Sequence, residues 1–298
     1  MNVIALQMDT AWEDKAKNFL RARALISQAA PPPGSLVILP EMFATGFSMN
    51  APAIAEDYGG ETEKFLGDLA AEFKIWIVAG LAARSSSGII RNKALVFSDQ
   101  GKLIGFYAKM RPFRPGDEHL HYQAGRHPLM FSWNGLHVCP FICYDLRFPE
   151  LFRDAAARWQ PELFIVIANF PEKRAEHWNA LLKARAIENQ AYVVGVNRVG
   201  TDPFYSYAGH SQIISPEGSV IANAGAGEGF ISATLDREKL QKYREGLPFL
   251  VDLKSDECAV GSQRFASLPL KGNYAVGEGS DNSTVRKSLS RDPNEKNR

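Results

Sequence analysis

The sequence predicts an α/β fold in which sheets are covered on an outer face by helices, and three observations support this. Short apolar runs, such as Leu36–Leu39 and Leu163–Ala168, alternate with longer helical segments, of which Lys173–Asn189 is a clear example. The runs are continuous, as in strands that are buried on both faces. Two further strand-like segments flank the turn Asp99-Gln100-Gly101 as a hairpin, which argues against a purely parallel, doubly wound sheet.

The first half of the chain contains five predicted strands and two predicted helices. The strands are expected at Val3–Met8, Leu36–Leu39, Ile75–Gly80, about Arg91–Ser98 and about Lys102–Ala108. The helices are expected at Asp14–Ala29, which stops at Pro31-Pro32-Pro33-Gly34, and at Glu61–Phe73. Strands and helices therefore alternate up to the hairpin.

The second half continues in the same style without repeating the sequence. Strands are expected at Leu136–Ile142, Leu163–Ala168, Tyr192–Asn197, Ser211–Ile214 and Ser219–Ala222, and helices at Pro149–Trp159 and Lys173–Asn189. Pro140 lies inside a predicted strand and cannot donate to a sheet, so we expect an edge or a bulge there.

Composition narrows the classes of partner and the location. Hydrophobic residues make up 45% of the chain and the formal net charge is +1, so neither a nucleic acid nor a membrane is an expected partner. No apolar run approaches the roughly 20 residues of a membrane-spanning helix, and the N-terminus lacks the features of a signal peptide. The three cysteines, Cys139, Cys143 and Cys258, form no disulfide framework. We expect a cytoplasmic protein.

Three chemically capable residues follow predicted strands: Glu41, Lys109 and Cys143. Each alone has an ordinary explanation, as a helix cap or turn acid, an exposed lysine and a packed core thiol respectively. Together they lie where loops diverge from a rigid sheet and where ligand clefts form.

Cys143 is the candidate nucleophile of this group. A strand that ends at Cys143 and turns into a helix is expected to place the sulfur near a helix N-terminus, which would lower the pKa of the thiol. No histidine has a compelling local context, so a Cys–His pair is the weaker assignment. Glu41 as base and Lys109 as oxyanion partner form an alternative, for which Glu41 must lie in a dry cleft.

These residues lie in three segments that resemble the motifs of the nitrilase, or carbon–nitrogen hydrolase, superfamily. The segments are Leu39-Pro40-Glu41, Lys109-Met110-Arg111-Pro112-Phe113 and Ile142-Cys143-Tyr144-Asp145-Leu146-Arg147-Phe148-Pro149-Glu150. Their order and their separations, 68 residues from Glu41 to Lys109 and 34 from Lys109 to Cys143, are also similar to the family.

Further segments resemble the omega-amidase branch of this superfamily. They are Gly116–Tyr122, Asn169–Arg174, His177-Trp178 and Ala184–Gln190. The resemblance covers roughly residues 1–256 and implies one carbon–nitrogen hydrolase domain of that extent. Residues 257–298 would form a C-terminal extension, poorly ordered towards its end, since they hold few apolar positions.

The resemblance implies a four-layer α-β-β-α sandwich that assembles as a homodimer or a larger oligomer. It also implies a fourth catalytic residue, Glu118, which would hold the lysine; otherwise Glu118 is a surface loop acid. The implied reaction is hydrolysis of the terminal amide of a small 2-oxo dicarboxylic acid monoamide, 2-oxoglutaramate or 2-oxosuccinamate, through a Cys143 thioester and without a cofactor.

Four residues are predicted to line the substrate site. We expect the backbone N–H of Tyr144 to contact the oxyanion, and Asn169, Phe170 and Arg174 to line the pocket. Arg174 is the candidate partner of the substrate carboxylate, unless it is an exposed helix-terminal residue. Many relatives have tryptophan at the position of Phe170. We expect Arg147 to brace the turn after the nucleophile.

Several alternatives stay open. The candidate metal ligands Cys139 and Cys143 would be about 13 Å apart on a strand, too far to share an ion, so no metal is expected. Another amidase of the superfamily, an N-carbamoyl amino acid hydrolase or a nitrilase, is the next candidate, and a cleft with two cations would favour it. A non-catalytic binding scaffold is a further possibility, as is a tail from about Ser255 that recruits a partner.

Overall fold

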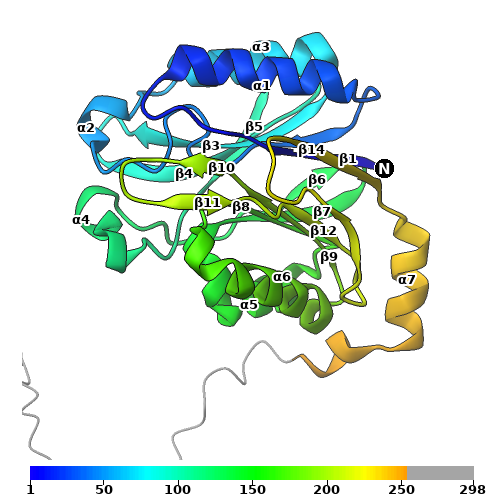
Figure 1. The fold of residues 1–298 in the computed structure, drawn as a ribbon. Helices are drawn as coiled ribbons and strands as arrows, with labels where there is room; N and C mark the ends of the chain where they lie inside the picture. Colours follow the sequence, from blue (N-terminus) through cyan, green and yellow to red (C-terminus); the bar gives the residue numbers. More distant parts are fainter. Residues whose placement is uncertain (254–298) are drawn as a thin grey trace, which may run out of the picture. The chain divides into compact units, whose positions relative to one another are not determined.

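The computed structural model describes residues 1–253, which form four layers (Figure 1). Two six-stranded sheets lie face to face. Helices α1 (Lys15–Ala29) and α3 (Glu61–Phe73) cover one outer face, and α5 (Pro149–Trp159) and α6 (Ala175–Asn189) cover the other. This confirms the predicted α-β-β-α sandwich. The expected extension at 257–298, and the last residues of the expected domain at 1–256, lie outside the described residues.

The first sheet has the strand order β14-β1-β2-β3-β4-β5. Strands β1, β2 and β3 are parallel, whereas β14, β4 and β5 pair antiparallel with their neighbours. The bounds are β1 Asn2–Gln7, β2 Leu36–Ile38, β3 Trp76–Arg84, β4 Ile90–Phe97, β5 Leu103–Ala108 and β14 Gly229–Thr234. Both types of pairing therefore occur in one sheet, and the expected hairpin is β4–β5.

The second sheet has the order β13-β12-β9-β8-β7-β6, with β7, β8 and β9 parallel. The bounds are β6 Phe131–Trp133, β7 Leu136–Ile142, β8 Leu163–Ala168, β9 Tyr192–Asn197, β12 Gln212–Ile214 and β13 Val220–Asn223. In both sheets a parallel centre, built from strand–helix–strand units, is extended by antiparallel strands at its sides.

Shorter elements complete the described chain. They are α2 (Ala51–Ile54), α4 (Glu118–His121), α7 (Arg237–Gly246), β10 (Val199–Thr201), β11 (Ser206–Ala208), η1 (Arg114–Gly116), η2 (Cys143–Arg147), η3 (Glu172–Arg174) and η4 (Phe249–Asp252). Strands β10 and β11 form a separate two-stranded hairpin. No helix among residues 1–253 is long and apolar enough to cross a membrane.

Alternate residues of the central strands face two different cores. In β2, Leu36 and Ile38 pack between the two sheets, whereas Val37 packs under the helices α1 and α3. Because side chains alternate along a strand, a strand buried on both faces must be apolar at every position. This is the physical reason for the continuous apolar runs in the sequence.

Pro140 lies in a local edge of the second sheet. The C=O of His137 faces β8, where it accepts from Glu162 N at 2.9 Å, so the backbone N of Pro140 faces the opposite side. On that side β6 pairs with β7 only as far as Val138, so Pro140 has no partner in β6. The edge predicted from Pro140 is therefore present.

Candidate active site

Glu41, Lys109 and Glu118 form a buried ionic cluster. Glu41 follows β2 and Lys109 follows β5, so the ends of two strands of one sheet bring them together. Lys109 Nζ lies 2.8 Å from Glu41 Oε1 and 2.8 Å from Glu118 Oε2. The three side chains are at most 1% exposed. Glu118 is thus not a surface loop acid, and the cleft around Glu41 is dry, as expected.

Asn92 on β4 connects the two carboxylates. Its Nδ2 donates to Glu41 Oε1 at 2.7 Å and to Glu118 Oε1 at 2.9 Å. Asn92 was not predicted as a site residue, although an asparagine inside a buried strand needs polar partners and is itself a signal of a buried polar site.

Asn169 fixes Glu41 from the second sheet. Its backbone N–H donates to Glu41 Oε2 at 2.8 Å, and its Nδ2 donates to the backbone O of Glu41 at 2.8 Å. Asn169 follows β8, so the site is assembled from the ends of strands in both sheets. These contacts orient the carboxylate of Glu41.

Cys143 sits on a strained turn directly after β7. Its φ of +47° is uncommon for a residue with a side chain, and such a conformation persists only where the surroundings hold it. Asp145 provides this support: its carboxylate accepts from Ile142 N at 3.0 Å, Tyr107 OH at 2.8 Å and Arg111 N at 2.9 Å. Asp145 was not predicted as a site residue; its signal in the sequence is an acid two residues after the cysteine in an apolar segment.

The expected lowering of the thiol pKa is wrong. Burial raises the pKa of Cys143 well above its ordinary value, and the charge of Glu41 raises it further, while Lys109 acts in the opposite direction. The turn after Cys143 is the short 3-10 helix η2, so no long helix directs its positive end at the sulfur. The thiol Sγ lies 3.8 Å from the backbone O of Asn169 as a donor. A protonated thiol of this kind requires a base.

Lys109 remains a cation despite its burial. Burial disfavours its charge, but Glu118 and Glu41 outweigh this effect and raise the pKa of Lys109 well above its ordinary value. The cluster therefore offers a fixed ammonium donor beside two carboxylates.

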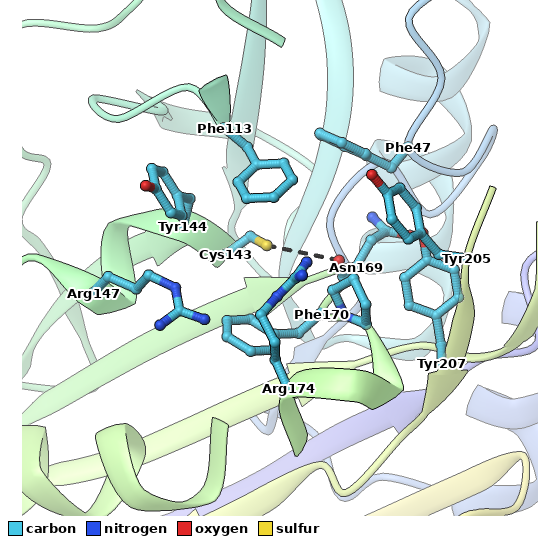
Figure 2. Close-up of a pocket in the computed structure, with 11 residues that line it drawn as sticks. Phe47, Phe113, Cys143, Tyr144, Arg147, Asn169, Phe170, Arg174, Tyr205 and Tyr207 are labelled. Atoms are coloured by element: carbon cyan, nitrogen blue, oxygen red, sulfur yellow. Dashed lines mark hydrogen bonds between the residues drawn. The ribbon is translucent and has the colours of Figure 1, made fainter. Parts of the chain in front are cut away.

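A pocket opens at the sulfur of Cys143 (Figure 2). All four residues predicted to bind substrate line this pocket, namely Tyr144, Asn169, Phe170 and Arg174. Tyr144 is the second residue of η2, where a backbone N–H has no acceptor within the helix. Four further aromatic residues of the pocket wall were not predicted from the sequence, namely Phe47, Phe113, Tyr205 and Tyr207.

Arg147 also lines the pocket and does not brace the turn as expected. Its Nη2 lies 3.1 Å from His177 Nδ1, and its guanidinium lies 5.4 Å from the ring centroid of Phe170. Burial lowers the pKa of Arg147, and the nearby charge of Arg174 lowers it further. The turn is braced instead by Arg185, which donates to the backbone O of Leu146 at 2.6 Å. The pocket thus has two guanidinium groups.

The described part of the chain holds no group of three or more His, Cys, Asp or Glu side chains arranged to bind a metal ion. Within it, Cys139 and Cys143 are both free and buried.

Comparisons with known proteins agree with this arrangement. Residues 2–245 match the sequence family described as carbon–nitrogen hydrolase. The chain is 38% identical over 253 residues to the omega-amidase YafV of Escherichia coli K12, which covers 83% of this chain and 94% of the relative. It is 33% identical over 255 residues to a 2-oxoglutaramate amidase of Bacillus subtilis, with 85% and 98% covered. A solved CN-hydrolase superfamily protein from Xanthomonas campestris has a TM-score of 0.81 and 36% identity, over 86% of this chain and 97% of the other.

Proposed function

This chain belongs to the carbon–nitrogen hydrolase family, and we propose that it is an amidase of the omega-amidase type. The proposed substrate is a small 2-oxo dicarboxylic acid monoamide, 2-oxoglutaramate or 2-oxosuccinamate, and the products are the dicarboxylic acid and ammonia. The relatives named omega-amidase and 2-oxoglutaramate amidase support this substrate. The observation that carries the chemistry is a buried Glu41–Lys109–Glu118 cluster beside the Cys143 thiol.

In the first half of the proposed reaction, Cys143 Sγ attacks the amide carbonyl carbon and Glu41 accepts the thiol proton. Lys109 Nζ and the backbone N–H of Tyr144 stabilise the oxyanion of the tetrahedral intermediate. The carbon–nitrogen bond then breaks while Glu41 returns its proton to the nitrogen. Ammonia leaves, and a thioester on Cys143 remains. The raised pKa of the thiol supports this order, because a neutral thiol needs a base as it attacks.

In the second half, Glu41 takes a proton from a water molecule that attacks the thioester carbon. The second tetrahedral intermediate uses the same oxyanion donors, and its carbon–sulfur bond breaks. The sulfur regains the proton from Glu41, and the acid is released. Glu118 acts by holding Lys109, and Asn92 and Asn169 hold Glu41 in its orientation.

The carboxylate and the 2-oxo group of the substrate would bind at the guanidinium of Arg174, with Arg147 beside it. Both residues line the pocket that opens at Cys143, where Arg147 lies over the ring of Phe170 and Arg174 lies over the ring of Phe113. A guanidinium suits this role because its planar N–H groups match two acceptor oxygens.

The two guanidinium groups also favour a second candidate function. A pocket with two cations suits an N-carbamoyl amino acid, so hydrolysis of such a compound, or of a nitrile, is the alternative activity of the same site. It would likewise begin with attack by Cys143 Sγ on the carbon bonded to nitrogen, at the pocket that selects the substrate.

The test is ammonia release from 2-oxoglutaramate, measured beside L-glutamine, an N-carbamoyl amino acid and a simple nitrile. We expect release from the 2-oxo amide, and its abolition in Cys143→Ala. Turnover of another member of the panel alone would overturn the substrate but keep the mechanism. A Cys143→Ala enzyme that retains half the activity would overturn the nucleophile. No turnover of any compound, with an unreactive thiol, would favour a binding scaffold.

We also propose that the catalytic domain spans residues 1–256 and that the enzyme acts in the cytoplasm as a homodimer or a larger oligomer. The free thiols Cys139 and Cys143 support a reducing location. Light scattering coupled to gel filtration tests the assembly: a mass close to 33.0 kDa would contradict it.

A further inference from the structure

The β10–β11 hairpin provides one wall of the pocket. Tyr205, in its loop, and Tyr207, on β11, line the pocket on the side away from Arg147 and Tyr144 (Figure 2). Neither residue contacts the Glu41–Lys109–Glu118 cluster through a hydrogen bond. The position of this wall therefore affects the space available to a substrate more than the chemistry at the sulfur.

Asp202 holds the hairpin loop in one conformation. Its Oδ1 accepts from the backbone N–H of Phe204 at 2.8 Å and of Tyr205 at 2.8 Å, and its Oδ2 accepts from Tyr207 OH at 2.6 Å. Its own backbone N–H donates to Tyr205 O at 2.9 Å. A single carboxylate thus fixes both tyrosines of the wall.

Arg198 places a positive charge beside this carboxylate. Its side chain is fully buried, its Nη1 lies 4.0 Å from Asp202 Oδ2, and its guanidinium lies 4.5 Å from the ring centroid of Tyr207. Its Nη2 donates to the backbone O of Thr10 at 2.8 Å and of Thr201 at 3.1 Å. A buried guanidinium without a countercharge is costly, and Asp202 shares this role with Asp9, whose Oδ1 lies 3.9 Å from Arg198 Nη2.

The loop has room to move if this support is lost. One hollow beside it is lined by residues 171–174 and 201–206, and a second is lined by Phe47, Phe204 and Tyr205 among others. The side chain of Phe204 is 70% exposed. Packing alone therefore does not fix the loop.

We propose that Asp202, supported by Arg198, is a positioning residue that sets the Tyr205–Tyr207 wall and thereby the length of the amide that the site accepts. The part of this inference that concerns substrate length rests on the proposed amidase function. The reacting carbonyl must lie at Cys143 Sγ whatever the chain length of the substrate. A displaced wall should therefore change KM and the preference between 2-oxosuccinamate and 2-oxoglutaramate, and should change kcat much less.

The decisive variant is Tyr207→Phe, which deletes the hydroxyl that donates to Asp202 and keeps the ring. Tyr192→Phe is its matched control: Tyr192 is also 4% exposed, and its hydroxyl donates to the backbone O of Asp236, in a different part of the fold. Asp202→Asn provides a second variant, in which the charge that faces Arg198 is removed.

Two readouts separate this inference from the proposed function. The first is the ratio of kcat/KM for the four-carbon and five-carbon 2-oxo amides, which we expect to change at least about threefold in Tyr207→Phe, mainly through KM. The second needs no substrate: it is the rate at which a bulky maleimide modifies Cys143, relative to iodoacetamide, measured on the Cys143 peptide by mass spectrometry. We expect this ratio to change at least about threefold in Tyr207→Phe and Asp202→Asn and not in Tyr192→Phe.

An unchanged modification ratio in both hairpin variants, or an equal change in Tyr192→Phe, would overturn the inference whatever the substrate is. A changed modification ratio in an enzyme that hydrolyses neither amide would support the role of Asp202 in positioning the wall. It would overturn the length selectivity together with the proposed substrate. A changed modification ratio with an unchanged preference between the two amides would overturn the length selectivity alone.

Discussion

At the scale of single residues, the site depends on one ammonium group shared by two carboxylates. Lys109 lies 2.8 Å from both Glu41 and Glu118, and all three side chains are buried. Charges in such a dry environment interact far more strongly than at the surface. The cluster is thus a fixed electrostatic unit in which the loss of one member changes the state of the others.

The first prediction concerns Lys109. Replacement by alanine should lower kcat/KM by about two to three orders of magnitude, the usual loss for a preorganised oxyanion donor. It should also destabilise the protein, because two buried carboxylates lose their countercharge. Steady-state kinetics and urea unfolding measure both effects. The control is Lys93→Ala: Lys93 is a half-buried lysine of the same sheet that lies over Phe106, and its loss should leave activity nearly unchanged. Equal activity loss in both variants would contradict the assigned role.

The second prediction concerns the thiol of Cys143. Because burial and then Glu41 raise its pKa, the thiolate is scarce at neutral pH and forms as the pH rises above the range of an ordinary thiol, about 8.5. The rate of alkylation of the Cys143 peptide by iodoacetamide should therefore keep rising above that pH. In Glu41→Gln the negative charge is gone while Lys109 remains, so the pH profile should shift to lower pH. An unshifted profile, or a shift to higher pH, would show that Glu41 does not control the thiol.

At the scale of elements, β3 determines where Glu41 lies. The backbone of Gly80 passes so close to the segment after β2 that an added Cβ would lie 2.6 Å from Glu41 Cα and 2.6 Å from Met42 N. Two hydrogen bonds join these segments, from Gly80 N to Pro40 O at 3.2 Å and from Phe43 N to Gly80 O at 3.2 Å. A side chain at this position would push the base away from the lysine.

The third prediction follows from this close approach. Gly80→Ala should destabilise the protein by about 1–3 kcal/mol, as in other overpacked cores, and should reduce kcat more than tenfold by displacing Glu41. Gly105→Ala on β5 is the control, since an added Cβ there meets only the side chain of Leu129, with Cδ1 at 3.4 Å and Cδ2 at 3.9 Å. The two variants are compared by thermal unfolding and ammonia release. Full activity in Gly80→Ala would show that Glu41 tolerates movement.

At the scale of the whole molecule, the site connects the two sheets. Tyr107 on β5 of the first sheet donates to Asp145, which follows β7 of the second, and Asn169 after β8 donates to Glu41. The buried carboxylate of Asp145 therefore contributes to global stability as well as to the turn of Cys143. Burial raises the pKa of Asp145 to about 7, although Lys109 and the accepted hydrogen bonds act in the opposite direction.

The fourth prediction is a dependence of stability on pH. The unfolded carboxyl group loses its proton near pH 3.9, whereas the folded one keeps it until about pH 7, so ionisation of Asp145 favours the unfolded chain between these values. The stability of the wild type relative to Asp145→Asn should fall as the pH rises from about 4 to about 7 and level off above. Urea unfolding at several pH values measures this difference, with exposed Asp154→Asn as control. If the stability of the wild type relative to Asp145→Asn rises over this pH range, the raised pKa of Asp145 is contradicted.

Local pattern determined a large part of the fold. The strands at 136–142, 163–168 and 192–197 and the helices at 61–73 and 149–159 have the predicted bounds, because strands buried on both faces and amphipathic helices leave strong periodic signals. Strand β14 and helix α7 were missed. β14 lies at the edge of a sheet with every second residue exposed, and α7 buries only Leu240, so neither produces a strong apolar pattern.

The sequence by itself also determined the residue types and the order of the candidate site, since Glu41, Lys109 and Cys143 each follow a strand within a recognisable motif. Only the tertiary structure decided their environment. The raised pKa of Cys143, the bridge made by Asn92 and the bracing of the turn by Arg185 all depend on groups far apart in the chain. Burial and charge act through distance in space, and neighbours in sequence do not specify that distance.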